Sequence, residues 1–247
     1  GPRRPGAARR RGRPHPGQLM SGPGLFDRST EAGLRSQLVE VSRLLVEQRL
    51  NRGTSGNAGA RLGDHLLVTP SGVPAADLAP EDMVALDFSG QVLGGGRPSS
   101  EWRLHRDVLA ARPDMHAVVH THSPFATSLA CLGHDLPPFH YMIAVAGGRT
   151  IRCAPYALFG SQALSDHALA ALQGRKACLL ANHGMVALGR DLDEALALAI
   201  EVESLCEMYW RACQLGAPAV LSDAQMDEVI ARFSQYGRQP GDEERSP

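Results

Sequence analysis

The stretch Ala117-Val118-Val119-His120-Thr121-His122 sets both the fold and the chemistry expected of this chain, because an apolar run ends in two histidines separated by one residue. A short run of this kind is typical of a buried β-strand. Residues i and i+2 of a strand point to the same face of a sheet, so the imidazoles of His120 and His122 are expected side by side. Neutral imidazole is a good ligand for zinc and related divalent ions. The stretch therefore predicts half of a metal site.

Two further residues complete a candidate set of four ligands. His183 follows a second apolar run, 177–181, and Glu101 follows the pair Ser99-Ser100. A lone His-x-His pair is also compatible with polar residues that merely end a strand, but the added histidine and carboxylate favour a metal site. A carboxylate that can leave the metal would provide the open position that catalysis needs. The expected ligands of one divalent ion, zinc by preference, are Glu101, His120, His122 and His183.

Helical and strand patterns alternate along the chain, and hairpin signals interrupt the βαβ rhythm. The first helix is expected over 29–51, where leucine and valine recur at spacings of three and four. The pattern predicts an α/β fold: a single three-layer domain in which helices cover a central, mostly antiparallel sheet. Further helices are expected at 101–111, 124–132, 161–173, 192–215 and 222–233, and strands at 66–69, 84–88, 91–93, 117–121, 150–154, 177–181 and 185–188.

The composition divides the chain into a folded part and two tails. The first 17 residues hold six arginines, four prolines and four glycines, with no aliphatic residue larger than alanine, so they cannot bury a core. Residues 1–24 are expected to be a disordered basic extension. The part ahead of a natural start at Met20 is expected to be vector-derived or mis-started rather than a nucleic-acid arm, because aromatic residues are missing. The folded domain is expected over 25–237 and a flexible tail over 238–247.

Several classes of protein are disfavoured by the sequence. No stretch approaches the ~20 apolar residues needed to span a bilayer, so no membrane partner is expected. The five cysteines form no CxxC pair and lie in apolar surroundings, as reduced cytoplasmic thiols do. Gly94-Gly95-Gly96 is not a dinucleotide fingerprint, and the phosphate-loop pattern GxxxxGK[ST] is missing. The single lysine, Lys176, falls in an expected turn and is a poor Schiff-base candidate, so carbanion chemistry would need the metal as its electron sink.

Three short loops of small polar residues are candidates for binding an anion. Glycine lets backbone amides approach a phosphate, and serine, threonine and asparagine add further donors, so lysine is not required. Each loop alone is equally compatible with an ordinary turn, and their spacing does not show that they converge. The loops are Gly53-Thr54-Ser55-Gly56-Asn57, Thr69-Pro70-Ser71-Gly72 and Pro98-Ser99-Ser100.

Taken in order, these motifs resemble those of the class II aldolases in the aldolase/adducin superfamily, with the L-fuculose-1-phosphate aldolase family as the closest match. The resemblance covers about residues 25–237. One departure is Gly59, where a serine commonly stands. Besides the three loops, the motifs that carry the resemblance are Ser99-Ser100-Glu101-Trp102, His120-Thr121-His122, His140-Tyr141-Met142, Ala154-Pro155-Tyr156-Ala157, Phe159-Gly160 and Asn182-His183-Gly184.

The resemblance implies a zinc-dependent aldolase that cleaves a ketose 1-phosphate, such as L-fuculose 1-phosphate, to dihydroxyacetone phosphate and an aldehyde. Zinc would act as a Lewis acid for an enediolate. Glu101 would leave the zinc when substrate binds and act as general acid/base, while the three histidines remain. The residues expected to bind the phosphate are Thr54, Ser55, Gly56, Asn57, Ser71, Gly72, Ser99 and Ser100.

The resemblance also implies a homotetramer with active sites at its subunit interfaces. Tyr141 matches a tyrosine that reaches into the neighbouring site and protonates the aldehyde oxygen, and Tyr236 matches a mobile C-terminal tyrosine. Alternatives on the same fold are a pentulose-5-phosphate 4-epimerase, a sugar-acid phosphate decarboxylase, a thioribulose-phosphate dehydratase and a non-catalytic adducin-like binding module. The four filled ligand positions favour an enzyme, and the two tyrosines favour an aldolase.

Overall fold

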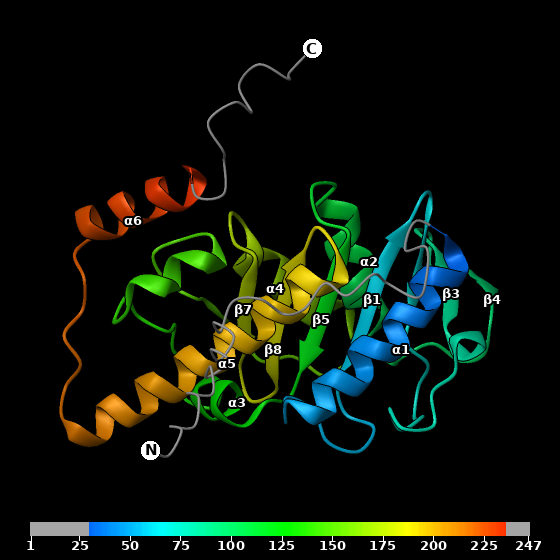
Figure 1. Cartoon of the computed structure of the whole chain (residues 1–247), viewed down its shortest axis with the longest axis horizontal. Helices are drawn as coiled ribbons and strands as arrows, with labels where there is room; N and C mark the ends of the chain where they lie inside the picture. The colour runs from blue at the N-terminus through cyan, green and yellow to red at the C-terminus, as the bar shows by residue number, and fades with distance from the viewer. Residues whose placement is uncertain (1–29, 236–247) are drawn as a thin grey trace, which may run out of the picture.

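A central sheet with helices on both faces forms the part of the chain that the computed structural model describes, residues 30–235 (Figure 1). The expected extension 1–24 and tail 238–247 lie outside these residues. Every neighbouring strand pair is antiparallel except the pair β6 (Cys153–Ala154) and β7 (Ala177–Leu180). The other strands are β1 (Asn57–Leu62), β2 (His65–Val68), β3 (Val84–Asp87), β4 (Val92–Gly94), β5 (Ala117–Thr121) and β8 (Gly184–Gly189), in the spatial order β4-β3-β2-β1-β5-β8-β7-β6.

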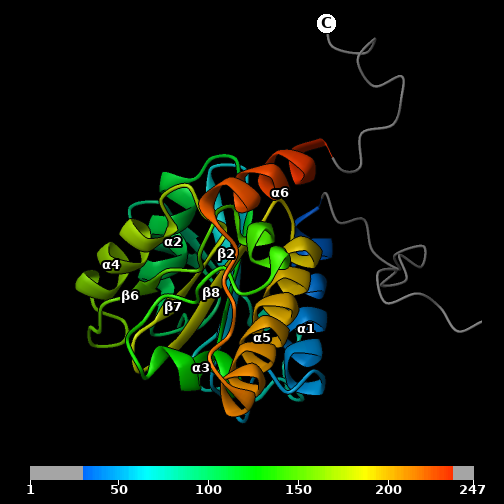
Figure 2. The same ribbon diagram turned by 90° about the vertical axis from the view of Figure 1, so that its left-hand side faces the viewer.

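Helices pack on both faces of the sheet, which confirms the predicted three-layer α/β fold (Figure 2). Helices α2 (Trp102–Ala111) and α4 (Gln162–Leu172) cover one face. The other face is covered by α1 (Glu31–Glu47), α3 (Pro124–Ala130) and α5 (Leu192–Leu215). Two 3-10 helices, η1 (Pro80–Asp82) and η2 (Tyr141–Ala146), and a last helix, α6 (Asp223–Gln235), complete the described elements. Within residues 30–235 no helix combines the length and the apolar character needed to cross a membrane.

Strand β5 lies in the middle of the sheet, between β1 and β8, and its side chains alternate between the two cores. Val118 packs in the core under α2 and α4, whereas Ala117 and Val119 pack in the core under α1 and α5. The same alternation directs His120 toward the α2 face. Glu101 is the residue immediately before α2, so the pleat of one strand aims the first histidine at the carboxylate.

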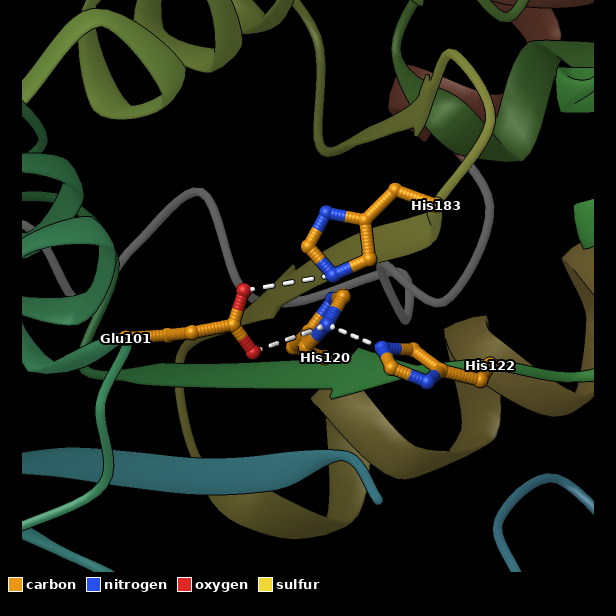
Figure 3. Close-up of side chains that lie close together, drawn as sticks. All are labelled: Glu101, His120, His122 and His183. Carbon is orange, nitrogen blue, oxygen red and sulfur yellow. Dashed lines mark hydrogen bonds and ion pairs between the residues drawn. The ribbon is translucent and has the colours of Figure 1, made fainter. Parts of the chain in front are cut away.

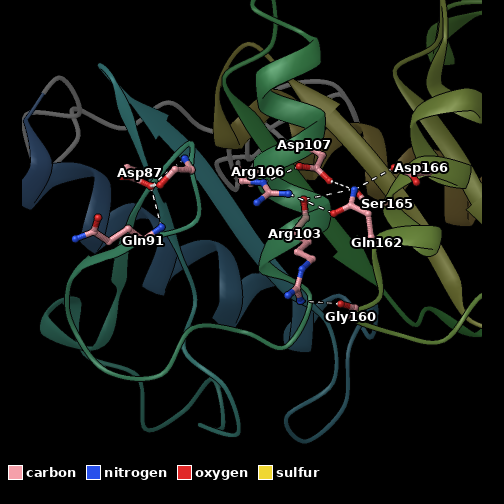
Figure 4. A network of polar contacts seen from close by, with 10 residues as sticks. Asp87, Gln91, Arg103, Arg106, Asp107, Gly160, Gln162, Ser165 and Asp166 are labelled. Carbon is pink, nitrogen blue, oxygen red and sulfur yellow. Dashed lines mark hydrogen bonds and ion pairs between the residues drawn. The ribbon is translucent and has the colours of Figure 1, made fainter.

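A polar network fixes α2 against α4 (Figure 4). The Asp107 carboxylate on α2 accepts hydrogen bonds from the Ser165 hydroxyl and the Gln162 amide on α4, both at 2.7 Å. Arg103 of α2 donates to the carbonyl of Gly160 at 3.1 Å. These contacts hold the start of α2, and with it the serine loop that precedes it, beside the segment that leads into α4.

Strand β1 and the two 3-10 helices were not predicted from the sequence. Strand β1 reads NAGARL and contains no β-branched or aromatic residue, so its own strand propensity is low. It forms because β2 and β5 pair with it on both sides. The helices η1 and η2 are only three and six residues long, too short to show a helical period in the sequence.

Two predicted elements are shorter than expected. The first helix ends at Glu47, because Arg49 adopts a positive φ of 60° and the chain turns Leu50 back into the core. The strand expected at 150–154 is reduced to β6, since Ile151 forms an isolated bridge with Leu136 instead of pairing within the sheet.

The N-terminus of α3 is capped by a carboxylate from α5. The first amides of a helix have no partner within it, and an acceptor at this end stabilises the helix. Glu203 provides both oxygens, which accept from the amides of Phe125 and Ala126 at 2.8 Å each. Because α3 begins two residues after His122, this cap ties the end of β5 to α5.

We expect Glu203→Ala to lower the free energy of unfolding by about 1–2 kcal/mol, because it leaves two helix amides without their acceptor. The matched control is Glu207→Ala one turn further along α5, which removes only a surface ion pair with Arg211. That change should cost less than about 0.5 kcal/mol. Urea unfolding at one fixed protein concentration measures both. Equal effects of the two substitutions would show that α3 does not depend on the cap.

Candidate metal centre

The four predicted ligands lie together at one end of the central strands (Figure 3). His120 belongs to β5 and His122 follows directly after it, while His183 lies in the turn between β7 and β8. One potential ligand atom from each histidine and from Glu101 falls within 4.8 Å of the others. Side chains that are 82 residues apart in the sequence thus face a single point, as a metal site requires.

Two local features of the chain bring His183 and His122 to this point. Gly184 lies so close to β5 that a Cβ atom there would be 2.2 Å from the carbonyl oxygen of Thr121, so only glycine lets the turn carrying His183 approach. The side-chain oxygen of Asn51 accepts a hydrogen bond from the backbone amide of His122 at 3.2 Å. The segment after α1 therefore holds the strand end on which the second ligand lies.

Hydrogen bonding leaves lone pairs facing one another at the centre of the cluster. His120 Nδ1 is 2.9 Å from the carbonyl oxygen of Met185, and because a carbonyl only accepts, Nδ1 carries the proton of a neutral ring. In the neutral ring Nε2 is therefore bare, and it lies 3.0 Å from Nε2 of His122 and 3.1 Å from a Glu101 oxygen. The other Glu101 oxygen is buried without a hydrogen-bond partner in the described part of the chain, 3.3 Å from His183 Nε2. Acceptors that converge in this way fit a divalent cation.

The electrostatics of the cluster keep three of its four ligands in the forms that bind metal. Burial lowers the pKa of His120, but the charge of Glu101 outweighs it and raises that pKa, so a metal that binds here displaces a proton from this ring. Burial raises the pKa of the Glu101 carboxyl, but the charges of His120 and His183 and the Asn57 hydrogen bond outweigh it and hold that pKa below its usual range. Burial, with repulsion from His120, lowers the pKa of His122 and that of His183 to about 4. At neutral pH the carboxylate is thus ionised and these two imidazoles are neutral, which is what coordination requires.

Three members of the cluster, Glu101, His122 and His183, line a cavity of about 390 Å³, while His120 is completely buried. All eight residues expected to bind phosphate line this cavity, so the three loops do converge, which their spacing alone could not show. Among the described residues that line it there is no lysine or arginine. Tyr156, Ala157 and Phe159 contribute apolar surface to the same cavity. A ligand here would meet backbone amides, hydroxyl groups, the cluster and an apolar wall.

Backbone hydrogen bonds clasp two of the loops to each other. The amide of Ser71 donates to the carbonyl of Arg97, and the amide of Ser99 donates to the carbonyl of Thr69, both at 3.0 Å. The Ser99 hydroxyl in turn accepts from the amide of Glu101 at 3.2 Å. The second and third loops and the carboxylate are therefore one rigid unit at the start of α2.

The structure places Tyr141 outside the lining of the cavity. Tyr141 is half-exposed at the start of η2, and its ring stacks on Phe233 of α6 with 6.4 Å between centroids. Tyr236 lies outside the described residues, so its role stays a prediction. Lys176 forms an ion pair with Glu194 at 3.3 Å and does not line the cavity, in agreement with the argument against a Schiff base.

Two residues near the cluster were missed by the sequence analysis. Asn51, which accepts from the His122 amide, was assigned only to the end of a helix. His105 is completely buried and contacts Asn57. Its position four residues after Glu101 was a usable signal, because residues i and i+4 of a helix share one face.

Comparison with known proteins establishes the family. The sequence model described as "Class II Aldolase and Adducin N-terminal domain" matches residues 36–210, well over half of the chain. The chain belongs to the class II aldolase and adducin family. The relatives named below are aldolases, and the chain is accordingly an enzyme of the aldolase (lyase) class.

Two curated relatives and one solved structure illustrate the similarity. The chain is 55% identical over 204 residues to the 5-methylthioribulose-1-phosphate/5-deoxyribulose-1-phosphate aldolase of Rhodospirillum rubrum, covering 83% of this chain and 92% of that protein. It is 42% identical over 205 residues to the L-fuculose phosphate aldolase of Escherichia coli K12, covering 83% and 95%. A solved L-fuculose 1-phosphate aldolase superposes with a TM-score of 0.78 at 39% identity, over 81% of this chain and 95% of that one.

We propose that Glu101, His120, His122 and His183 hold one divalent ion per chain, and we expect His122→Ala to lose most of it. Each ligand forms a direct bond to the metal, so removing one imidazole weakens binding severely. The matched control is His116→Ala, which removes an exposed imidazole just before the same strand. Elemental analysis after gel filtration gives the metal content of both. An unchanged one-to-one metal content in His122→Ala would contradict the assignment.

Proposed function

We propose that this member of the class II aldolase family is a zinc-dependent enzyme that cleaves a ketose 1-phosphate to dihydroxyacetone phosphate and a short aldehyde. The observation that supports it most directly is the union of two features in one cavity. The cluster of three imidazoles and one carboxylate reaches the cavity through Glu101, His122 and His183, and three loops rich in amide and hydroxyl donors line the same cavity. Metal-assisted cleavage of a phosphorylated sugar needs a metal site and a phosphate-binding site in the same cavity.

Zinc is the proposed metal because its preferred donors are imidazole nitrogen and carboxylate oxygen. Bound there, it would supply Lewis-acid stabilisation of the negative charge that develops on the sugar oxygens next to the bond that breaks. The contacts made by the ligands themselves suit zinc too. A histidine that binds a metal through one ring nitrogen usually donates the N–H of the other nitrogen to a carbonyl, as His120 does to Met185.

The phosphate is proposed to lie against the three loops and the start of α2. Ser99 and Ser100 lie just before Glu101, the residue that precedes that helix, whose first amides and dipole favour an anion. The turns at Thr54–Asn57 and Ser71-Gly72 line the same cavity. These neutral donors would fix the phosphorylated end and thereby set which carbon faces the cluster.

Glu101 is the proposed general acid/base. During cleavage the C4 hydroxyl loses its proton, the bond between C3 and C4 breaks, and C3 takes up a proton. We assign the C3 proton to Glu101, which is buried beside the cluster and would be displaced from the metal by substrate. We assign removal of the C4 hydroxyl proton to Tyr141 of a neighbouring subunit, which would return it to the aldehyde oxygen in the reverse reaction. Tyr236 is proposed as a further catalytic residue.

Two groups of substrates agree with the relatives. L-Fuculose 1-phosphate was expected from the motifs, whereas the 55% identical relative is named for 5-methylthioribulose 1-phosphate and 5-deoxyribulose 1-phosphate. All three sugars end in a methyl or methylthio group, which suits the apolar wall formed by Tyr156, Ala157 and Phe159. The higher identity favours the deoxy- and methylthio-pentulose phosphates.

Incubation with these three ketose phosphates should release dihydroxyacetone phosphate, which glycerol-3-phosphate dehydrogenase reports by oxidation of NADH. Glu101→Gln is the matched control, because an amide retains weak coordination but cannot carry the proton. At equal zinc content it should turn over about 10²–10⁴ times more slowly. Near wild-type turnover by Glu101→Gln would show that Glu101 is only a structural ligand. If the wild-type protein releases no dihydroxyacetone phosphate from any of the three sugars, the aldolase reaction is contradicted in favour of an epimerase, decarboxylase or dehydratase.

We further infer that the protein forms a homotetramer whose active sites are shared between subunits, and that it is located in the cytoplasm. Large apolar side chains remain exposed near the cavity and around η2, among them Tyr141, Leu158 and Phe159, and an interface would cover them. All five cysteines are free, which suits a reducing compartment.

Mixing inactive Tyr141→Phe with inactive Glu101→Gln, under conditions that exchange subunits, should restore activity. If Tyr141 acts across an interface, some sites in the hybrids contain both intact residues. Mass spectrometry of the intact assemblies shows whether exchange has occurred and counts the subunits. Exchange without recovered activity would place Tyr141 in its own subunit's site or outside catalysis.

A further inference from the structure

Helix α2 carries a histidine that the proposed reaction does not use. The side chain of His105 is completely buried, one helical turn after Glu101. Its Nε2 lies 2.5 Å from Oδ1 of Asn57, and Nδ2 of Asn57 donates to Oε2 of Glu101 at 2.9 Å. Two consecutive hydrogen bonds thus lead from the core of the protein to the carboxylate.

The chemistry of the three groups determines the direction of both bonds. An ionised carboxylate only accepts, so Asn57 must turn its NH₂ group toward Glu101 and its oxygen toward His105. An amide oxygen also only accepts, so the ring of His105 must carry its proton on Nε2. Burial lowers the pKa of His105 to about 3, which keeps the ring neutral with a single N–H.

The surroundings of the other ring nitrogen agree with this assignment. Nδ1 of His105 is buried and has no hydrogen-bond partner in the described part of the chain. It faces Gly59 of β1, where a Cβ atom would lie 2.8 Å away, so no side chain offers an acceptor from that position. A proton on Nδ1 would be a buried donor without a partner, which costs more than leaving that nitrogen bare.

We propose that His105 is a positioning residue for Glu101, which it orients through the amide of Asn57. Without the Nε2 proton, the Asn57 amide is free to rotate and present its oxygen to the carboxylate, acceptor against acceptor. The bond from His105 excludes that rotamer and keeps Glu101 where it can exchange a proton. The inference deepens the proposed function and rests on the acid/base role of Glu101.

A set of substitutions compared at equal zinc content tests the proposal. His105→Leu retains the side-chain volume without a donor and should lower kcat by about 10–100-fold with little change in KM. His105→Gln can place an N–H near the position of Nε2 and should restore most of that loss. If His105 acts only through Asn57, adding His105→Leu to Asn57→Ala should produce no further loss of kcat.

The proton position in the wild-type protein provides a readout that does not depend on activity or on a variant that folds. Long-range ¹H–¹⁵N correlation of the zinc-loaded, ¹⁵N-histidine-labelled protein should show His105 with its proton on Nε2 between about pH 6 and 8. A proton on Nδ1 or a charged ring would overturn the proposal.

Three further results would also overturn the proposal. They are equal losses of kcat in His105→Leu and His105→Gln, additive losses when His105→Leu is combined with Asn57→Ala, and a wild-type kcat in His105→Leu. If no ketose 1-phosphate is cleaved, the proposed function fails by itself. The tautomer then still decides whether His105 orients Asn57 toward Glu101.

Discussion

The hydrogen bond between the ring of His120 and the carbonyl oxygen of Met185 is the interaction on which the rest of the site depends. It crosses from β5 to β8 and determines which nitrogen of the first histidine is bare. In the neutral ring that nitrogen then faces His122 and Glu101 at about hydrogen-bond distance. A backbone carbonyl in the sheet therefore sets the tautomer that leaves a lone pair at the centre of the cluster.

The absence of lysine and arginine from the described cavity lining has an electrostatic consequence under the proposed function. A phosphate that meets only amides, hydroxyl groups and a helix terminus is held by many weak dipoles. These lose their effect once the donors are displaced from the anion by more than hydrogen-bond distance. Long cationic side chains tolerate a shifted ligand, whereas a cradle of this kind selects one phosphate position. Fixing that position fixes the sugar carbons relative to the cluster.

The sequence predicted the site more completely than it predicted the elements that carry it. His120 and His122 could be placed because strand periodicity alone puts i and i+2 on one face, and Glu101 and His183 because the motifs are strongly characteristic. The convergence of the loops could not be derived from their spacing, since it depends on backbone bonds such as Ser71 to Arg97. Strand β1 escaped prediction because its pairing partners, rather than its own residues, make it a strand. The role of Tyr141 stays a prediction, because the site that it is expected to serve lies in another copy of the chain.

The central place of β5 in the sheet also determines when the site can exist during synthesis. Its two neighbours, β1 and β8, come from opposite sides of it in the sequence, so three of the four candidate ligands are in the chain well before β8. Until β8 pairs, His120 lacks the Met185 carbonyl, and His183 has no turn to hold it. Pairing of such distant segments is a late and slow step in folding. A nascent chain would thus display histidines that bind metal only loosely, and the tight site would arise when the sheet closes.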